Sequence, residues 1–105
     1  VLTARCAGAG LEVEDRPQSR PHCVDAESEL VRGLMKCYRE YTGRDDKPIA
    51  IGGGTYVHGI ENGVAFGCAM PGTDNRMHGA DEFAVIAELE LSARIFAQAI
   101  ADFCS

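Results

Sequence analysis

The sequence predicts an α/β fold, and three observations support this. Two stretches, residues 26–41 and 86–103, repeat apolar side chains at the three- and four-residue spacing of an amphipathic helix. Two short apolar runs, residues 48–51 and 64–70, border glycines and have the length of buried strands. The helices are therefore expected to cover a sheet of two or more strands, whose order and direction the sequence leaves open.

The composition is that of one small globular domain or of a part of a larger one. Of the 105 residues, 46% are hydrophobic and 25% are charged, which excludes wholesale disorder. A net charge of -6 argues against nucleic acid and anionic membranes as partners, and no apolar run approaches the roughly 20 residues of a membrane span. Five cysteines without a CxxC pair predict reduced thiols and a cytoplasmic protein.

The two predicted helices carry end signals and a core-facing stripe. Asp25 is the expected N-cap of the helix over residues 26–41, and Gly43 its expected terminator. Cys37 and Cys104 are expected to fill small spaces in the core, because both lie within helical patterns. The stripe of the last helix is expected to pack on the sheet, and it consists of Ile86, Leu89, Ala93, Phe96, Ile100 and Phe103.

The first residues have the pattern expected at the end of another domain. Residues 2–9 predict a short helix that stops at glycines, and residues 11–14 alternate apolar and acidic side chains as an edge strand does. Residues 15–23 contain prolines and arginines without an apolar period, which is typical of a crossover between domains. We therefore expect the sequence to begin inside a longer protein.

Two loops are candidates for binding. Gly52, Gly53 and Gly54 follow a predicted strand, so their backbone could take positive φ and hold a carboxylate; the alternative is a tight turn without function. A phosphate-binding P-loop is excluded, because no Lys-Ser/Thr pair follows the glycines. His78 lies in a polar loop with two carboxylates close behind it, and the alternative is an exposed surface histidine.

Other reactive side chains give weaker signals. His22 and Cys23 are adjacent on an extended segment, where neighbouring side chains point to opposite faces. This argues against a Cys–His nucleophile and favours a solvent-exposed His22. A thiol-redox role for Cys23 and Cys68 depends on the cysteine count alone.

Several motifs together carry a family resemblance. The chain contains, in this order, PHCVD at 21–25, LV at 30–31, YTG at 41–43, IGGGTY at 51–56, GVAFG at 63–67, MHGADE at 77–82 and IFAQAI at 95–100. Their order and spacing resemble the C-terminal end of the M20 metallopeptidases. The most similar branch is that of the PepV-like dipeptidases, related to carnosinase and succinyl-diaminopimelate desuccinylase.

This resemblance implies a fragment of a zinc-exopeptidase-type catalytic domain. Residues 1–20 would end a lid domain, and residues 21–105 would form the C-terminal part of the catalytic domain. His78 would be a metal ligand. The terminal carboxylate of the substrate would be bound by Gly53, Gly54 and Thr55.

The resemblance also implies the chemistry of the whole enzyme. It would be a dipeptidase or aminoacyl hydrolase that cleaves the amide bond of a dipeptide or N-acyl amino acid with water activated by two zinc ions, with manganese or cobalt as alternatives. The chain lacks the family's His-x-Asp ligand motif and paired glutamates. We therefore expect no catalytic residue in it, a missing N-terminal catalytic half as its partner, and an inactive isolated fragment. The alternative is a free-standing, non-catalytic binding or self-assembly module, since a partial sheet exposes an edge and apolar patches that favour self-association.

Overall fold

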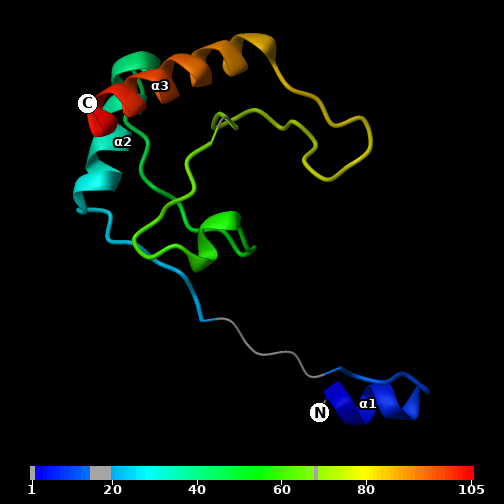
Figure 1. The fold of residues 1–105 in the computed structure, drawn as a ribbon. Coiled ribbons are helices and arrows are strands. Elements are labelled where there is room, and N and C mark those ends of the chain that lie inside the picture. Colours follow the sequence, from blue (N-terminus) through cyan, green and yellow to red (C-terminus); the bar gives the residue numbers. More distant parts are fainter. Residues whose placement is uncertain (1, 15–19, 68) are drawn as a thin grey trace.

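The computed structural model describes residues 2–14, 20–67 and 69–105. Within these residues it contains four helical elements and no strand: α1 (Leu2–Gly8), α2 (Glu29–Thr42), the 3-10 helix η1 (Tyr56–Gly59) and α3 (Ile86–Cys104) (Figure 1). None of the described helices combines the length and apolar character of a membrane span. The three predicted helices are confirmed, while most of the predicted crossover at 15–23 lies outside the described residues.

Helix α2 begins three residues later than predicted and ends where predicted. Ser28 is the N-cap, because its Oγ accepts the backbone N–H of Val31 at 3.4 Å. Asp25 instead accepts a backbone N–H two residues further on at 2.9 Å, which makes a turn ahead of the helix. Gly43 ends α2 in a left-handed conformation with φ of 67°, and its N–H donates to a carbonyl of the last turn.

Helices α2 and α3 pack on each other and form the core of the described chain. The buried hydrophobic residues all lie on these two helices: Val31, Cys37, Tyr38, Ile95 and Ala99. Two polar contacts join the helices, since the Cys37 thiol lies 3.6 Å from Oδ2 of Asp102 and the Tyr41 hydroxyl donates to Oε1 of Gln98 at 3.2 Å. Cys37 is fully buried as predicted, whereas Cys104 is exposed, because none of the described elements covers the last residue of α3.

The predicted sheet is not confirmed. Residues 11–14, 48–51 and the described part of 64–70 form no strand. A strand needs a neighbouring strand to satisfy its backbone N–H and C=O groups, and the described chain places none beside these runs. Ile49 is 85% exposed and Ile51 61% exposed, so the apolar run before the glycine loop has no cover.

Helix α3 uses a different face against α2 from the one predicted for the core. Ile95 lies on the face that packs on α2 and is 2% exposed. Much of the predicted stripe remains open to solvent, with exposed fractions of 73% for Ile86, 46% for Leu89 and 62% for Ile100. Phe96 of this stripe meets Phe66 edge to face, with ring centroids 5.4 Å apart. The stripe therefore lacks the sheet that the sequence pattern requires.

The chain is more extended than a complete domain of its length. Its Cα radius of gyration is 18.5 Å, against about 13 Å for a compact domain of this size. Figure 1 shows α1 apart from the helix pair, and the described residues between α2 and α3 passing from α2 through η1 and returning to α3. The described residues thus form one two-helix core with long attached segments.

Candidate functional site

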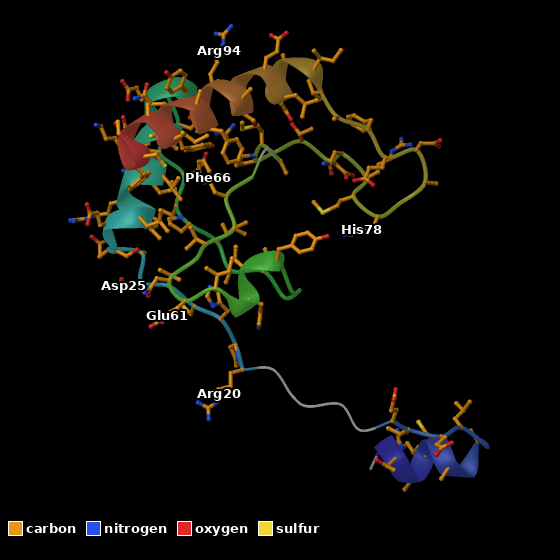
Figure 2. All side chains as sticks on the ribbon, in the orientation of Figure 1. Arg20, Asp25, Glu61, Phe66, His78 and Arg94 are labelled. Atoms are coloured by element: carbon orange, nitrogen blue, oxygen red, sulfur yellow. The ribbon has the colours of Figure 1, made fainter. Side chains whose placement is uncertain are left out.

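His78 lies with an exposed side chain on the loop that leads into α3 (Figure 2). Two hydrogen bonds hold this loop in place. The N–H of Phe83 donates to the carbonyl of Asn75 at 3.2 Å and closes the loop, and the Thr73 hydroxyl donates to Oε1 of Glu88 on α3 at 2.6 Å. The loop is therefore fixed to the helix core, with the imidazole of His78 facing outward.

The backbone around His78 is left-handed at three non-glycine residues. The φ angles are 56° at Arg76, 63° at His78 and 56° at Asp81. The N–H of Gly79 donates to the carbonyl of Arg76 at 2.7 Å, so His78 occupies the third position of a turn in which positive φ is required. Left-handed non-glycine residues cost energy and cluster at binding and catalytic sites. The turn thus presents the exposed imidazole of His78 from a defined, left-handed backbone.

The glycine loop is open on all sides. None of Gly52, Gly53 and Gly54 has a positive φ, contrary to the expected conformation, and a Cβ added to any of them would meet nothing within 4 Å. Thr55 caps η1, because its Oγ1 accepts the N–H of Val57 at 3.3 Å. This bond uses a lone pair of the oxygen, so the hydroxyl hydrogen of Thr55 can still be donated to an anion.

The structure does not join the predicted site residues into one centre. Within the described residues, no hydrogen bond or ion pair connects the His78 loop to the glycine loop. No group of three or more His, Cys, Asp or Glu side chains among them is placed to hold a metal ion. Of the two cysteines of the thiol-redox hypothesis, Cys23 is exposed and Cys68 lies outside the described residues.

Two histidines, His22 and His58, make a contact that the sequence did not predict. His22, expected to be exposed, is partly buried, and its Nε2 lies 2.6 Å from the carbonyl oxygen of Gly63. The ring of His58 lies 5.8 Å from that of His22, centroid to centroid. The two histidines are far apart in the sequence and belong to different segments, so no local pattern indicates this contact.

A cluster of Tyr38, Arg44 and Asp46, which the sequence also did not predict, closes the turn after α2. The Tyr38 hydroxyl donates to Oδ2 of Asp46 at 2.5 Å, and Nε of Arg44 donates to the same oxygen at 2.7 Å. The Arg44 guanidinium, followed by the Tyr38 hydroxyl, holds the pKa of Asp46 below its usual value. Burial, followed by the bond to Asp46, raises the pKa of Tyr38. Both donors bond Oδ2 of the Asp46 carboxylate and tie the turn to α2, and we therefore interpret the cluster as structural.

Comparison with known proteins decides the family. The model of peptidase family M20/M25/M40 matches residues 7–102. The chain belongs to this family. The "Putative dipeptidase YtjP" of Bacillus subtilis (strain 168) is 40% identical over 90 residues, which are 86% of this chain and 19% of that protein. The "Beta-Ala-Xaa dipeptidase" of Lactobacillus delbrueckii subsp. lactis is 39% identical over 90 residues, with the same two coverages of 86% and 19%.

A third relative extends the match over nearly the whole chain. It is a "putative dipeptidase" of Staphylococcus haemolyticus (strain JCSC1435), 35% identical over 103 residues, which are 98% of this chain and 22% of that protein. The chain thus spans about a fifth of the length of the curated relatives it matches. No solved structure gives a significant match.

The described part of this M20 chain does not by itself fit a zinc ion. A zinc site takes three or four protein ligands, and the described residues hold no cluster of that size. His78 is available as one ligand, since its imidazole is exposed on an anchored loop. The remaining ligands of a zinc site would have to come from outside these residues.

Proposed function

We propose that the chain is the C-terminal part of a longer cytoplasmic dipeptidase or aminoacyl hydrolase, which cleaves the amide bond of a dipeptide or N-acyl amino acid. The observation that supports this most strongly is the match of residues 7–102 to the peptidase family. The relatives named above carry the word dipeptidase in their names, and one is named for β-Ala-Xaa dipeptides. They are also roughly four to five times as long as this chain.

Within that enzyme, His78 supplies one ligand to a dinuclear zinc site, with manganese or cobalt as alternative metals. The exposed imidazole, the left-handed backbone and the anchoring of the loop to α3 support this role. The other ligands belong to the N-terminal catalytic half, in agreement with the lack of a metal-binding cluster in the described residues. The isolated chain is therefore inactive.

The glycine loop holds the terminal carboxylate of the substrate. Gly53 and Gly54 have open space around them for a ligand, and their backbone N–H groups can approach an anion closely because no Cβ intervenes. The hydroxyl of Thr55 accepts one N–H at the start of η1 and supplies a further donor.

The sheet forms only in the longer protein. Residues 48–51 and 64–70 become strands when strands of the preceding part satisfy their backbone groups. The open stripe of α3, which includes Ile86 and Ile100 with 73% and 62% exposure, then covers that sheet. Residues 1–20 end the lid domain, and residues 21–105 belong to the catalytic domain.

An alternative function is that of a free-standing, non-catalytic module that assembles with itself. The same open stripe of α3 supports it, because a second copy could cover these apolar side chains as well as a sheet could. The two functions differ in the size of the natural gene product. A product of about 105 residues that forms dimers or larger assemblies in analytical ultracentrifugation supports the module, whereas a product roughly four to five times as long supports the enzyme.

The enzyme function is tested by hydrolysis of a panel of dipeptides, β-Ala-Xaa included, and N-acyl amino acids. We expect the metal-loaded natural gene product to cleave members of this panel and the 105-residue chain to cleave none. His78→Ala should abolish the activity, while Met77→Ala, which alters another exposed side chain of the same loop, should keep it. No hydrolysis by the natural product, or full activity of His78→Ala, would contradict the proposal.

A further inference from the structure

Two histidines join the segment at residues 20–22 to the segment that follows the glycine loop. Nε2 of His22 lies 2.6 Å from the carbonyl oxygen of Gly63, and Nε2 of His58 lies 3.0 Å from the carbonyl oxygen of Arg20. Each segment thus contributes one imidazole and one carbonyl to the other. The two rings lie 5.8 Å apart at an angle of 43°, so the two bonds run side by side in opposite directions.

The acceptors determine that Nε2 carries a hydrogen in both rings. A backbone carbonyl oxygen can only accept a hydrogen bond, so Nε2 must carry the hydrogen in His22 and also in His58. A neutral imidazole has one N–H, which leaves Nδ1 of both rings without a hydrogen. The structure therefore assigns the same tautomer, Nε2–H, to two separate histidines.

Local geometry holds the groups that make these bonds. The N–H of Gly63 donates to the carbonyl of Ile60 at 3.1 Å, and a Cβ at Gly63 would lie 3.0 Å from Cγ2 of Ile60. A Cβ at this position would therefore require the Ile60 side chain to shift, and the turn restrains the backbone at Gly63. His58 lies on η1, whose start is capped by Thr55. The two groups that this segment contributes, at Gly63 and His58, are thus restrained by short-range bonds.

We propose that His22 and His58 are positioning residues of the glycine loop. This inference rests on the proposed function, in which Gly53, Gly54 and Thr55 bind the carboxylate of the substrate. Three consecutive glycines lose more backbone entropy on ordering than any other tripeptide, so a binding loop built from them needs restraints from outside. The reciprocal bonds supply this restraint, and they tie the loop to the segment that is predicted to return from the lid domain.

The tautomers can be read directly by NMR. The natural gene product is labelled with ¹⁵N in histidine and studied in mildly alkaline solution, where free imidazole is neutral. The signals of the two rings are assigned from their loss in His22→Gln and His58→Gln. We expect a proton on Nε2 and a bare Nδ1 in both rings, whereas averaging between tautomers or a proton on Nδ1 of either ring would overturn the inference.

A graded set of variants tests the positioning role in the active protein. The amide nitrogen of glutamine can take the place of Nε2, while that of asparagine reaches only the place of Nδ1. His22→Ala and His22→Asn should therefore raise KM for a dipeptide about fivefold, the effect of losing one net hydrogen bond, with kcat within about twofold. His22→Gln should restore most of the lost affinity.

The KM and kcat values of these His22 variants decide whether the histidine positions the glycine loop. Equal KM values for His22→Ala and His22→Gln, or a change confined to kcat, would overturn the positioning role. If the natural product hydrolyses no dipeptide, the proposed function fails, and the tautomer measurement still decides whether the two histidines bridge the segments. The two failures are thus distinguishable.

Discussion

Two isoleucines on α3 provide a matched test of which face of the helix is buried. Ile95 is 2% exposed and packs in the core with α2, whereas Ile100 on the same helix is 62% exposed. Replacement by alanine removes three carbon groups at about 0.8 kcal/mol each when fully buried, and alanine regains about 0.4 kcal/mol of helix propensity at either position. We therefore expect Ile95→Ala to lower the free energy of unfolding by about 2 kcal/mol and Ile100→Ala by about 0.5 kcal/mol.

The assay is urea unfolding of the 105-residue chain followed by far-UV circular dichroism. If Ile95→Ala is already unfolded without urea, it will lack the far-UV helical signal that Ile100→Ala retains. This difference identifies the same buried face. Equal losses at the two positions would refute the assignment of the buried face. In the proposed longer enzyme the sheet would cover Ile100, so its replacement there should cost as much as that of Ile95.

Three further predictions concern a thiol, a carboxylate and a helix cap. Burial, followed by the bond to Asp102, raises the pKa of the Cys37 thiol, so alkylation followed by mass spectrometry should modify exposed Cys23 in the native chain and Cys37 only after unfolding. The pKa of Asp46 is lowered in the folded state. The ionised carboxylate therefore stabilises the fold at neutral pH, and this stabilisation is lost in acid. The urea midpoints of wild type and Asp46→Asn should differ at neutral pH and converge well below about pH 3.9. Ser28→Ala should cost about 1 kcal/mol in the same unfolding assay, whereas Asp25→Ala should cost much less, because Ser28 caps α2; the reverse order would contradict the assigned cap.

The helices could be predicted from the sequence because their signals are local. A periodic apolar pattern and a terminal Gly43 are sufficient to place α2 and to end it. The start was misplaced, since Asp25 and Ser28 are both good capping residues and only the fold shows which one meets the N–H groups of the first turn. The face of α3 that packs on α2 was also missed, because α3 carries apolar side chains on two faces and periodicity does not choose between them.

The sheet and part of the site depend on partners that a sequence pattern does not show. The run 48–51 has the composition of a buried strand, yet a strand exists only beside another strand. His78 was a candidate from its loop and its motif, but its left-handed backbone could not be predicted from the sequence. The contact between His22 and His58 joins segments that are distant in the sequence, and only the fold brings them together.

The zinc content of the natural gene product tests the central claim most directly. Wild type, His78→Ala and Met77→Ala are purified in parallel, dialysed against zinc-free buffer and measured by inductively coupled plasma mass spectrometry. Wild type and Met77→Ala should each retain about two zinc ions per chain, the number that the proposed dinuclear site requires, and His78→Ala should lose at least one of them. Undiminished zinc in His78→Ala would contradict the account.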